Sequence, residues 1–391
     1  MASKEISATG MPQDSSTGAS HRYSRIVIKA GSALLTSGGE TLDQRVMESL
    51  VHQLAELRTQ GVEVILVTSG AVAAGRRALG LDREGNTLPL RQVMAAVGMG
   101  KLLHSYEQLF QQHGIPVAQA LLTRHDLENR SGYLNVRNTL LKLMELAVIP
   151  IINENDVVAV DELGGRVFGD NDTLSALVAN LIDADLLVLL GRVEGLYTAD
   201  PTVAENARLI PKVERVDKDI ETVAGSSRDG LGRGGMATKL EAAKLAMSSG
   251  TTVVIAGGHQ SNVLIKLTRG ESVGTMFVPA AERKESRKRW LMSGASENKG
   301  EMVVDEGAAD ALTRKGSSLL PAGIVEVNGS FKRGDVVAVV GADGIRLAIG
   351  MTNYGSEEVT AIKGVHSRRI AELLGHNYGD EAIHRNNMLV L

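Results

Sequence analysis

The chain has 391 residues, of which 43% are hydrophobic and 23% are charged, and its formal net charge is −4. These values are typical of a globular protein of two or three domains with a large core. The sequence contains no cysteine, which excludes disulfides, cysteine-ligated metals and thiol chemistry. The negative net charge offers no global attraction for nucleic acid, and aromatic residues, at 3%, are too few for a base-stacking platform.

The N-terminal segment, residues 1–23, is rich in Ser, Ala, Gly and Thr. It lacks the apolar core of a secretion signal, and its composition is typical of a disordered tail. No apolar run elsewhere reaches membrane-spanning length, because Asn, Asp or Gly interrupts the longest candidates. We therefore expect a disordered tail over residues 1–23, a cytoplasmic location and no membrane partner.

Short apolar segments alternate with longer amphipathic segments through residues 24–280, the first expected domain. The apolar segments predict strands, and the amphipathic segments, with apolar residues at helical spacing, predict helices. Strands are expected at 25–29, 62–68, 115–122, 148–152, 186–190 and 252–255. Helices are expected at 42–60, 93–112, 134–146, 172–182 and 235–247. This α/β order predicts a largely parallel open sheet with helices on both faces, and ligands of such sheets bind where the strands end.

A charged stretch at 282–290 (ERKESRKRW) is typical of a solvated linker, which we place at 281–298. After it the pattern changes to short strands separated by glycine turns, with one helix at 306–313. Strands are expected at 301–304, 324–327, 335–340 and 345–349. Residues 299–391 are therefore expected to form a small β-rich domain with a C-terminal extension.

Two predicted strands end in residues suited to binding an anion. Lys29 ends the first strand, before Gly31 and Ser32, so its ammonium group and the following backbone N–H groups can face phosphate oxygens. Ser69 and Gly70 follow the next strand and open a helix. The alternatives are a lysine that points into solvent and a serine that only caps its helix. No GxxxxGK[ST] motif occurs in the sequence.

Two polar segments are candidates for recognising a small charged molecule. Residues 153–156 (Asn-Glu-Asn-Asp) follow an apolar strand directly, and such amides and carboxylates suit an amino acid's ammonium and carboxylate groups. Residues 169–173 (Gly-Asp-Asn-Asp-Thr) open a helix with more polar groups than a cap needs. An acid here can orient lysines or hold Mg²⁺ through water. An Asx-rich loop and a plain helix cap are the structural alternatives.

The strongest local signal is the glycine-rich segment 230–239, GLGRGGMATK, which precedes a helix that carries Lys239 in its first turns. Glycines let backbone N–H groups approach a polyphosphate, and the positive end of the helix dipole adds to their attraction. Lys239 would then face the transferred phosphate. A flexible loop without a ligand is the alternative.

These segments, taken together and in order, resemble the amino acid kinase family, and most closely its glutamate-phosphorylating members. The resemblance is carried by VIKAGSALLT (27–36), VTSGAVAAG (67–75), LLTRHDLENR (121–130), INENDVV (152–158), FGDNDTLSALVA (168–179), EGLYTADP (194–201) and GRGGMATKLEAA (232–242). VDEGAADAL (304–312) and GSSLLPAGI (316–324) resemble a PUA domain. The resemblance implies an αβα sandwich of the amino acid kinase fold, followed by this PUA domain.

The resemblance also implies roles for individual residues. Lys29 and Lys239 are expected to contact the ATP phosphates, with Asp172 orienting both lysines. Glutamate contacts are expected from Ser69, Asp156 and Asn171. The nucleotide is expected to lie against Arg233, Gly234, Gly235, Met236, Ala237, Thr238 and Lys239. Members commonly carry Thr-Asp where this chain has Gly191 and Arg192, so nucleotide contacts there would come from the backbone.

The implied reaction uses ATP and Mg²⁺ to phosphorylate the γ-carboxylate of L-glutamate, the first step of proline biosynthesis. A carboxylate is already ionised at pH 7, so the reaction needs no general base. We assign no residue as a metal ligand. Proline is expected to inhibit, a glutamyl phosphate reductase to act downstream, and the chain to form a homo-oligomer. The alternatives are a sister kinase of the family and a protein that binds or modifies RNA through its PUA domain.

Overall fold

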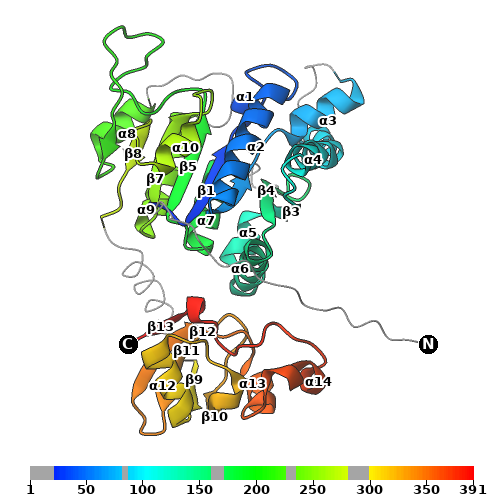
Figure 1. The fold of residues 1–391 in the computed structure, drawn as a ribbon, viewed down its shortest axis with the longest axis vertical. Coiled ribbons are helices and arrows are strands. Elements are labelled where there is room, and N and C mark those ends of the chain that lie inside the picture. The colour runs from blue at the N-terminus through cyan, green and yellow to red at the C-terminus, as the bar shows by residue number, and fades with distance from the viewer. Residues whose placement is uncertain (1–21, 82–86, 160–170, 226–234, 281–298) are drawn as a thin grey trace, which may run out of the picture.

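The structure, a computed structural model, describes residues 22–81, 87–159, 171–225, 235–280 and 299–391. Within these ranges the chain forms two separate sheets (Figure 1). The first has eight strands in the order β3-β4-β2-β1-β5-β7-β8-β6. Their bounds are β1 (Arg25–Ala30), β2 (Glu63–Val67), β3 (Val117–Leu122), β4 (Ile149–Glu154), β5 (Leu186–Gly191), β6 (Lys212–Val213), β7 (Thr252–Gly257) and β8 (Thr275–Phe277).

The first sheet is largely parallel, as the sequence predicts. The neighbours from β3 through β7 pair in parallel, and only the pairing of β7 with β8 is antiparallel among the described strand pairs of this sheet. Its helices are α1 (Ser32–Leu35), α2 (Gln44–Thr59), α3 (Ala71–Leu79), α4 (Leu88–Gln111), α5 (Arg124–Glu128), α6 (Arg130–Glu145), α7 (Asn171–Leu181), α8 (Lys218–Gly225), α9 (Met236–Ser248) and α10 (Val263–Thr268).

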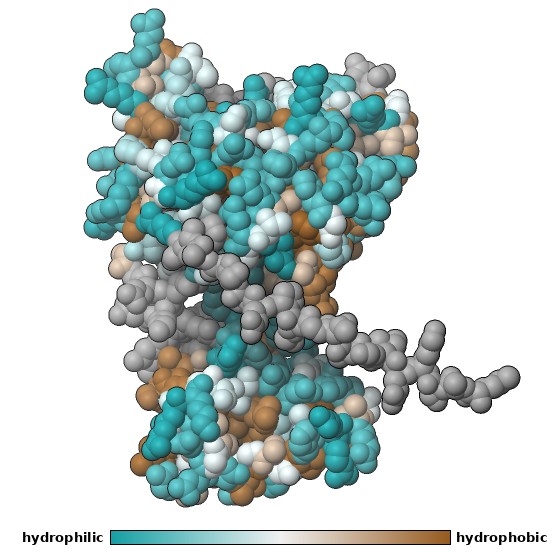
Figure 2. Space-filling model, viewed as in Figure 1, coloured by the Kyte–Doolittle hydropathy of each residue, from teal (hydrophilic) through white to brown (hydrophobic). Residues whose placement is uncertain are grey.

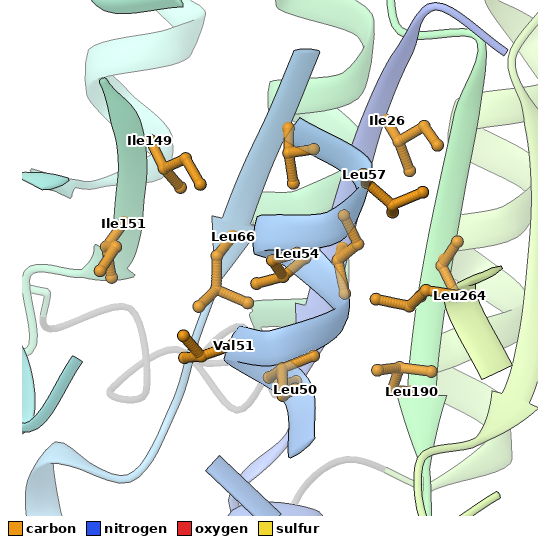
Figure 3. Packing of buried hydrophobic residues seen from close by; sticks show 14 of the residues in the cluster. Ile26, Leu50, Val51, Leu54, Leu57, Leu66, Ile149, Ile151, Leu190 and Leu264 are labelled. Carbon is orange, nitrogen blue, oxygen red and sulfur yellow. The ribbon is translucent and has the colours of Figure 1, made fainter. Parts of the chain in front are cut away.

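Two hydrophobic cores cover the two faces of the sheet, because successive strand residues point to opposite faces. Ile26 and Ile28 pack with helices α2, α4 and α10 on one face, whereas Val27 packs with α6, α7 and α9 on the other. Figure 3 shows the first core, in which Leu50, Leu54 and neighbouring residues of α2 lie against the sheet. The predicted α/β architecture, with helices on both faces, is confirmed.

The second sheet has five strands in the order β10-β9-β11-β12-β13 and its own core, which includes Met302, Val339 and Tyr354. It confirms the predicted β-rich C-terminal part. Its strands are β9 (Gly300–Val304), β10 (Ile324–Gly329), β11 (Val336–Gly341), β12 (Arg346–Met351) and β13 (Met388–Val390). Its α-helices are α12 (Glu306–Lys315), α13 (Ser356–Ile362) and α14 (Ile370–Leu374).

The two sheets are joined through the first turns of α6, the labelled helix of the upper part that lies lowest in Figure 1. Leu134 of α6 is fully buried in a small cluster with three residues of the second sheet, Val336, Ile349 and Met351. Arg130 Nη1 lies 3.0 Å from Asp335 Oδ1 in the same contact. The C-terminal part therefore packs on the helix that follows β3 and α5.

Hydrophilic residues cover most of the face seen in Figure 2, and hydrophobic residues occur there in separate patches. No helix within the described ranges is both long enough and apolar enough to cross a membrane. Residues 1–21 of the expected tail and the expected linker, 281–298, lie outside the described residues.

Candidate active site

The parallel strands bring their C-terminal ends, and the polar residues that follow them, to one edge of the first sheet. β1 carries Lys29 at this edge, and β2 ends just before Thr68 and Ser69. Helix α7 begins here with Asn171, and α9 begins after Gly235. The segments that the sequence predicted as a site thus meet where ligands of such sheets bind.

Lys29, Asp172 and Lys239 form a buried charged triad at this edge. Lys29 Nζ lies 2.6 Å from Asp172 Oδ1, and Lys239 Nζ lies 2.9 Å from Asp172 Oδ2. The three side chains are only 3%, 0% and 8% exposed, in the same order. The end of β1 and the starts of α7 and α9 therefore place three charged side chains in direct contact, although the residues are far apart in sequence.

The two lysines keep Asp172 ionised. Burial alone would raise the pKa of Asp172, but the ammonium groups of Lys29 and Lys239 attract and hydrogen bond to the carboxylate, and they hold its pKa well below the ordinary value. Asp172 is therefore ionised at neutral pH. Two ammonium groups lie against this carboxylate at the edge of the sheet, and ammonium groups in such a place suit an anionic ligand.

Glycines make room for the lysine ends. A Cβ atom at Gly31 would lie 3.2 Å from Lys29 Nζ, and a Cβ atom at Gly191 would lie 3.3 Å from Lys239 Cε. Both distances are shorter than ordinary van der Waals contact. A larger side chain at either position would compete with the lysine for the space at the edge of the sheet.

Thr238 joins the same carboxylate. Its Oγ1 lies 3.0 Å from Asp172 Oδ2 and 2.9 Å from the carbonyl oxygen of Gly235. The hydroxyl has one proton, so it donates to one of these acceptors at a time. Consecutive residues of α9, Thr238 and Lys239, are thus both held against Asp172.

A cluster of amide and hydroxyl groups surrounds Asn171. Its Nδ2 lies 2.8 Å from the carbonyl oxygen of Thr68, 2.8 Å from Ser69 Oγ and 3.0 Å from Asn153 Oδ1. Three acceptors around Nδ2 fix the orientation of the amide. Asn171 Oδ1 is buried and has no hydrogen-bond partner among the described residues. This oxygen is therefore a buried acceptor for which a ligand could supply the donor.

The cluster contains two residues to which the sequence analysis assigned no individual role, Thr68 and Asn153. Asn153 is buried, and its Nδ2 contacts Met99 Sδ at 3.3 Å. It belongs to the polar segment 153–156 that marks this strand end, so the signal for it was present in the sequence. Thr68 contributes a main-chain carbonyl, for which side-chain chemistry gives no signal.

The remaining predicted residues lie around this centre. Asp156 is half-buried in the turn directly after β4. Arg192 is exposed and lies close to Gly38: a Cβ atom added to Gly38 would be 3.1 Å from Arg192 Nη1. Gly235 precedes α9, with Met236 buried and Ala237 exposed in its first turn. Two further predicted residues, Arg233 and Gly234, lie outside the described residues.

The described side chains could accommodate a metal ion that is bound to a nucleotide, but they form no metal site of their own. They contain no group of three or more His, Asp or Glu side chains that could hold a metal ion. The carboxylate of Asp172 is occupied by two lysines and a hydroxyl. As far as the described residues go, phosphate oxygens of a bound nucleotide would be the main ligands for a divalent cation at this edge.

Comparison with known proteins places the chain in a family. Residues 24–257 match the amino acid kinase family, and residues 300–374 match the PUA domain. The first match covers more than half of the chain and spans the whole triad. The chain belongs to the amino acid kinase family, with a PUA domain in its C-terminal part.

Curated proteins that are similar in sequence to this chain carry the name glutamate 5-kinase. The protein of that name from Dehalococcoides mccartyi strain CBDB1 is 51% identical over 369 residues, which are 94% of this chain and 99% of the relative. That from Herpetosiphon aurantiacus is 51% identical over 94% of this chain and 98% of its own length. A solved UMP kinase from Bacillus anthracis is far more distant, with 17% identity and a TM-score of 0.45 over 66% of this chain and 97% of its own.

Proposed function

We propose that the chain is a glutamate 5-kinase, which transfers the γ-phosphate of ATP to the γ-carboxylate of L-glutamate. The observation that carries this proposal is the buried triad of Lys29, Asp172 and Lys239, which lies beside the amide cluster around Asn171. Relatives of that name match this chain over nearly their whole length. These matches do not favour the alternative, an RNA-modifying protein.

The chemistry needs positioning and charge stabilisation rather than a base. The γ-carboxylate of glutamate is ionised at neutral pH and can attack the γ-phosphorus directly. Negative charge on the transferred phosphoryl group is stabilised by the ammonium groups of Lys29 and Lys239, and Asp172 fixes where both lie. Mg²⁺, when bound with ATP, would neutralise part of the phosphate charge. Atoms balance without an added proton, since the carboxylate oxygen replaces the oxygen of the leaving ADP.

The nucleotide is proposed to lie against the start of α9 and the end of β5. Gly191, next to Lys239, and Arg192 would present their backbone to it. Gly235, Met236, Ala237 and Thr238 would follow the phosphates toward Lys239, together with Arg233 and Gly234 of the preceding segment. This arrangement uses the positive end of the α9 dipole, which favours phosphate.

Glutamate is proposed to lie on the neighbouring side, toward β2 and β4. Asn171 Oδ1, a buried acceptor without a partner in the described residues, suits the α-ammonium group of the substrate. Ser69 Oγ lies 2.8 Å from Asn171 Nδ2 and would contact the same molecule, as would Asp156 from the turn after β4. The phosphate lysines and this cluster would then hold the two reactants side by side.

The product is an acyl phosphate, which hydrolyses readily. We therefore infer a cytoplasmic enzyme whose product passes to a glutamyl phosphate reductase in proline biosynthesis, and we expect a homo-oligomer. Proline, which shares the α-carboxylate and a cationic nitrogen with glutamate, is the proposed inhibitor. If saturating glutamate relieves the inhibition by proline, the two molecules share a site. If millimolar proline leaves the activity unchanged, proline is not an inhibitor.

A substrate panel tests the proposed function. ADP release is measured with ATP and, in separate reactions, L-glutamate, L-aspartate, N-acetylglutamate or UMP as the acceptor. We expect glutamate to give the highest kcat/KM. A clear preference for another acceptor would make the chain a sister kinase, and no acceptor-dependent release with any of them would contradict the kinase assignment.

A further inference from the structure

A pair of hydroxyl groups lies directly behind the amide cluster, inside the hydrophobic core. Tyr106 of α4 is fully buried, and its hydroxyl lies 2.8 Å from Thr68 Oγ1. Thr68 is also buried, between β2 and the Ser69–Gly70 turn. Neither hydroxyl reaches the surface of the protein, so neither is placed to touch a substrate.

The two hydroxyls connect α4 to the main chain of the site. Burial raises the pKa of Tyr106, so the phenol stays neutral beside Thr68. The two oxygens share one hydrogen bond, in which either can be the donor. Thr68 Oγ1 also lies 3.3 Å from the carbonyl oxygen of Ser69, to which it can donate. The result is a series of hydrogen bonds that runs from α4 to the main chain of the site.

Thr68 connects this series of hydrogen bonds to the groups proposed to bind glutamate. Its carbonyl oxygen accepts from Asn171 Nδ2 at 2.8 Å, and its N–H donates to the carbonyl of Ile152 at 2.8 Å. The next residue, Ser69, bonds to the same Asn171 amide through its own hydroxyl. Any rotation of the peptide groups around Thr68 would therefore move both Ser69 and Asn171.

Packing alone does not require these hydroxyls. Phe110 lies one turn further along α4, is equally buried and packs in the same core without a polar atom. Phenylalanine and valine would fill nearly the volumes of tyrosine and threonine. When both partners of a buried hydrogen bond are replaced by apolar groups of the same shape, stability can remain nearly unchanged.

We propose that Tyr106 and Thr68 are positioning residues, whose hydroxyl pair sets the main chain at Ser69 and thereby orients the acceptor-substrate contacts of Ser69 and Asn171. The proposal rests on the proposed function only in naming glutamate as the acceptor. It predicts an effect on the acceptor and not on ATP, because Thr68 bonds to Asn171 and leads directly to Ser69, whereas the groups proposed for ATP are Lys29, Lys239 and the start of α9.

The test compares Tyr106→Phe, Thr68→Val, the double variant and Thr68→Ser by thermal stability, kcat, and the KM values for glutamate and for ATP. Each single variant leaves a buried hydroxyl without its partner and should lower Tm, whereas the double variant should recover much of that loss. The double variant should still raise the KM for glutamate about threefold to tenfold, the loss expected for one or two hydrogen bonds, and leave the KM for ATP within about twofold. Thr68→Ser, which keeps the hydroxyl, should restore a near-normal KM for glutamate.

Thr251→Val is the matched control. Thr251 is another buried threonine, and its Oγ1 donates to the carbonyl of Ala184 at 3.1 Å, just before β7 and far from this edge. It should lower stability without changing either KM. An unchanged KM for glutamate in the double variant, or a rise equal to that for ATP, overturns the proposal. If the double variant does not fold, the comparison of Thr68→Val with Thr68→Ser tests the proposal instead. Equal KM values for glutamate in these two variants would overturn the proposal.

The same measurements separate this proposal from the proposed function. If the unaltered protein releases no ADP with glutamate, the proposed function fails, and the four variants are compared with the acceptor that the protein does use. A selective rise in the KM for that acceptor would still support positioning by Tyr106 and Thr68, and an unselective or absent rise would overturn it.

Discussion

At the scale of single residues, the charge of Asp172 decides what the site can hold. A buried carboxylate is costly unless it is paired, and Asp172 has a lysine on each oxygen. The lysines need this carboxylate equally, since two buried ammonium groups would repel each other without it. The two ammonium groups that Asp172 holds at this edge are of the charge that a phosphate group needs.

Replacing Lys239 should remove charge stabilisation and leave the fold intact. We expect Lys239→Ala to lower kcat by about 10²-fold or more, in line with the loss of other single stabilising donors. Lys244→Ala is the control on the same helix, because Lys244 pairs with Glu221 and Glu241 at the surface. Steady-state kinetics would check both variants. Near-normal turnover of the Lys239 variant would refute the role that we propose for this lysine.

Replacing Asp172 should change stability in a pH-dependent way. Asp172→Asn removes the only carboxylate of the triad and should destabilise the fold by about 3–5 kcal/mol at neutral pH, as for other broken buried pairs. The folded-state pKa of Asp172 lies below its ordinary value of 3.8. Its contribution is therefore fully present above pH 3.8 and is lost as the pH falls below that value toward the folded-state pKa.

Denaturant unfolding of the native protein and the Asp172→Asn variant between pH 3 and pH 8 would measure this difference. The gap in unfolding free energy attributable to Asp172 should stay constant from about pH 8 to about pH 5 and narrow at more acid pH. A gap that widens on acidification would have the wrong sign.

The two lysines of the triad could be predicted because each follows a local rule, whereas the role of Asp172 came from the resemblance to the family. Lys29 ends an apolar strand before a glycine, and Lys239 opens a helix after a glycine-rich segment. Tyr106 could not be predicted in this way. It reads as one more core residue of an amphipathic helix, and its partner Thr68 is 38 residues away in sequence. Only the folded chain brings the two hydroxyls together.

At the scale of elements, two glycines allow α3 and α4 to pack in backbone contact. A Cβ atom on Gly98 would lie 1.8 Å from the carbonyl oxygen of Ala71, and one on Gly75 would lie 1.7 Å from that of Met94. Ala71 is the first residue of α3, directly after the Ser69–Gly70 turn. Close packing of these helices therefore bears on the position of Ser69.

Gly98→Ala should force the two helices apart. We expect it to cost about 1–3 kcal/mol of stability, the usual range for overpacking, and to raise the KM for glutamate by displacing Ser69. Gly100→Ala is a matched control, because a Cβ on Gly100 of α4 would have no atom of another described segment within 4 Å. In that control, alanine should stabilise the helix by about 0.5–1 kcal/mol. Equal thermal stability of the two variants would contradict this account of the helix pair.

The long elements could be predicted and some short ones could not. Apolar strands such as β5 and strongly amphipathic helices such as α2 have clear periodic patterns. Helix α6 begins at Arg130, four residues before the expected start, because Asn129 caps it by accepting from the N–H groups of Ser131 and Gly132. The two-residue β6 and three-residue β8 are too short to show a period, and their pairing depends on distant segments.

At the scale of the whole molecule, α6 links the C-terminal part to the first sheet. Arg137 of α6 is buried, with Nη2 lying 2.6 Å from Asp183 Oδ2 and 3.3 Å from the carbonyl oxygen of Asn386. Asp335 contacts both Arg130 of this helix and Lys299, with distances of 3.0 and 3.1 Å to its Oδ1. Sequence patterns indicated two separate units, but they held no signal for this contact, which depends on side chains far apart in the chain.

Leu134→Ala should weaken that contact. Removal of a fully buried leucine costs about 2–5 kcal/mol, and here the loss falls on the cluster between the two sheets. We expect a lower Tm and faster proteolysis between the two parts, measured against Leu146→Ala. Leu146 follows the same helix but is 62% exposed, so that variant should behave like the native protein. An unchanged Tm and cleavage rate for Leu134→Ala would show that the contact contributes nothing in solution.

The central claim is that the buried triad transfers phosphate from ATP to the γ-carboxylate of glutamate. Trapping with hydroxylamine tests it most directly, because hydroxylamine converts an acyl phosphate into a stable hydroxamate. With ATP, Mg²⁺ and glutamate, the protein should form γ-glutamyl hydroxamate in proportion to ADP, and Lys239→Ala should lose both products together while Lys244→Ala keeps them. ADP release without hydroxamate, or hydroxamate formation that survives the loss of Lys239, would contradict the account.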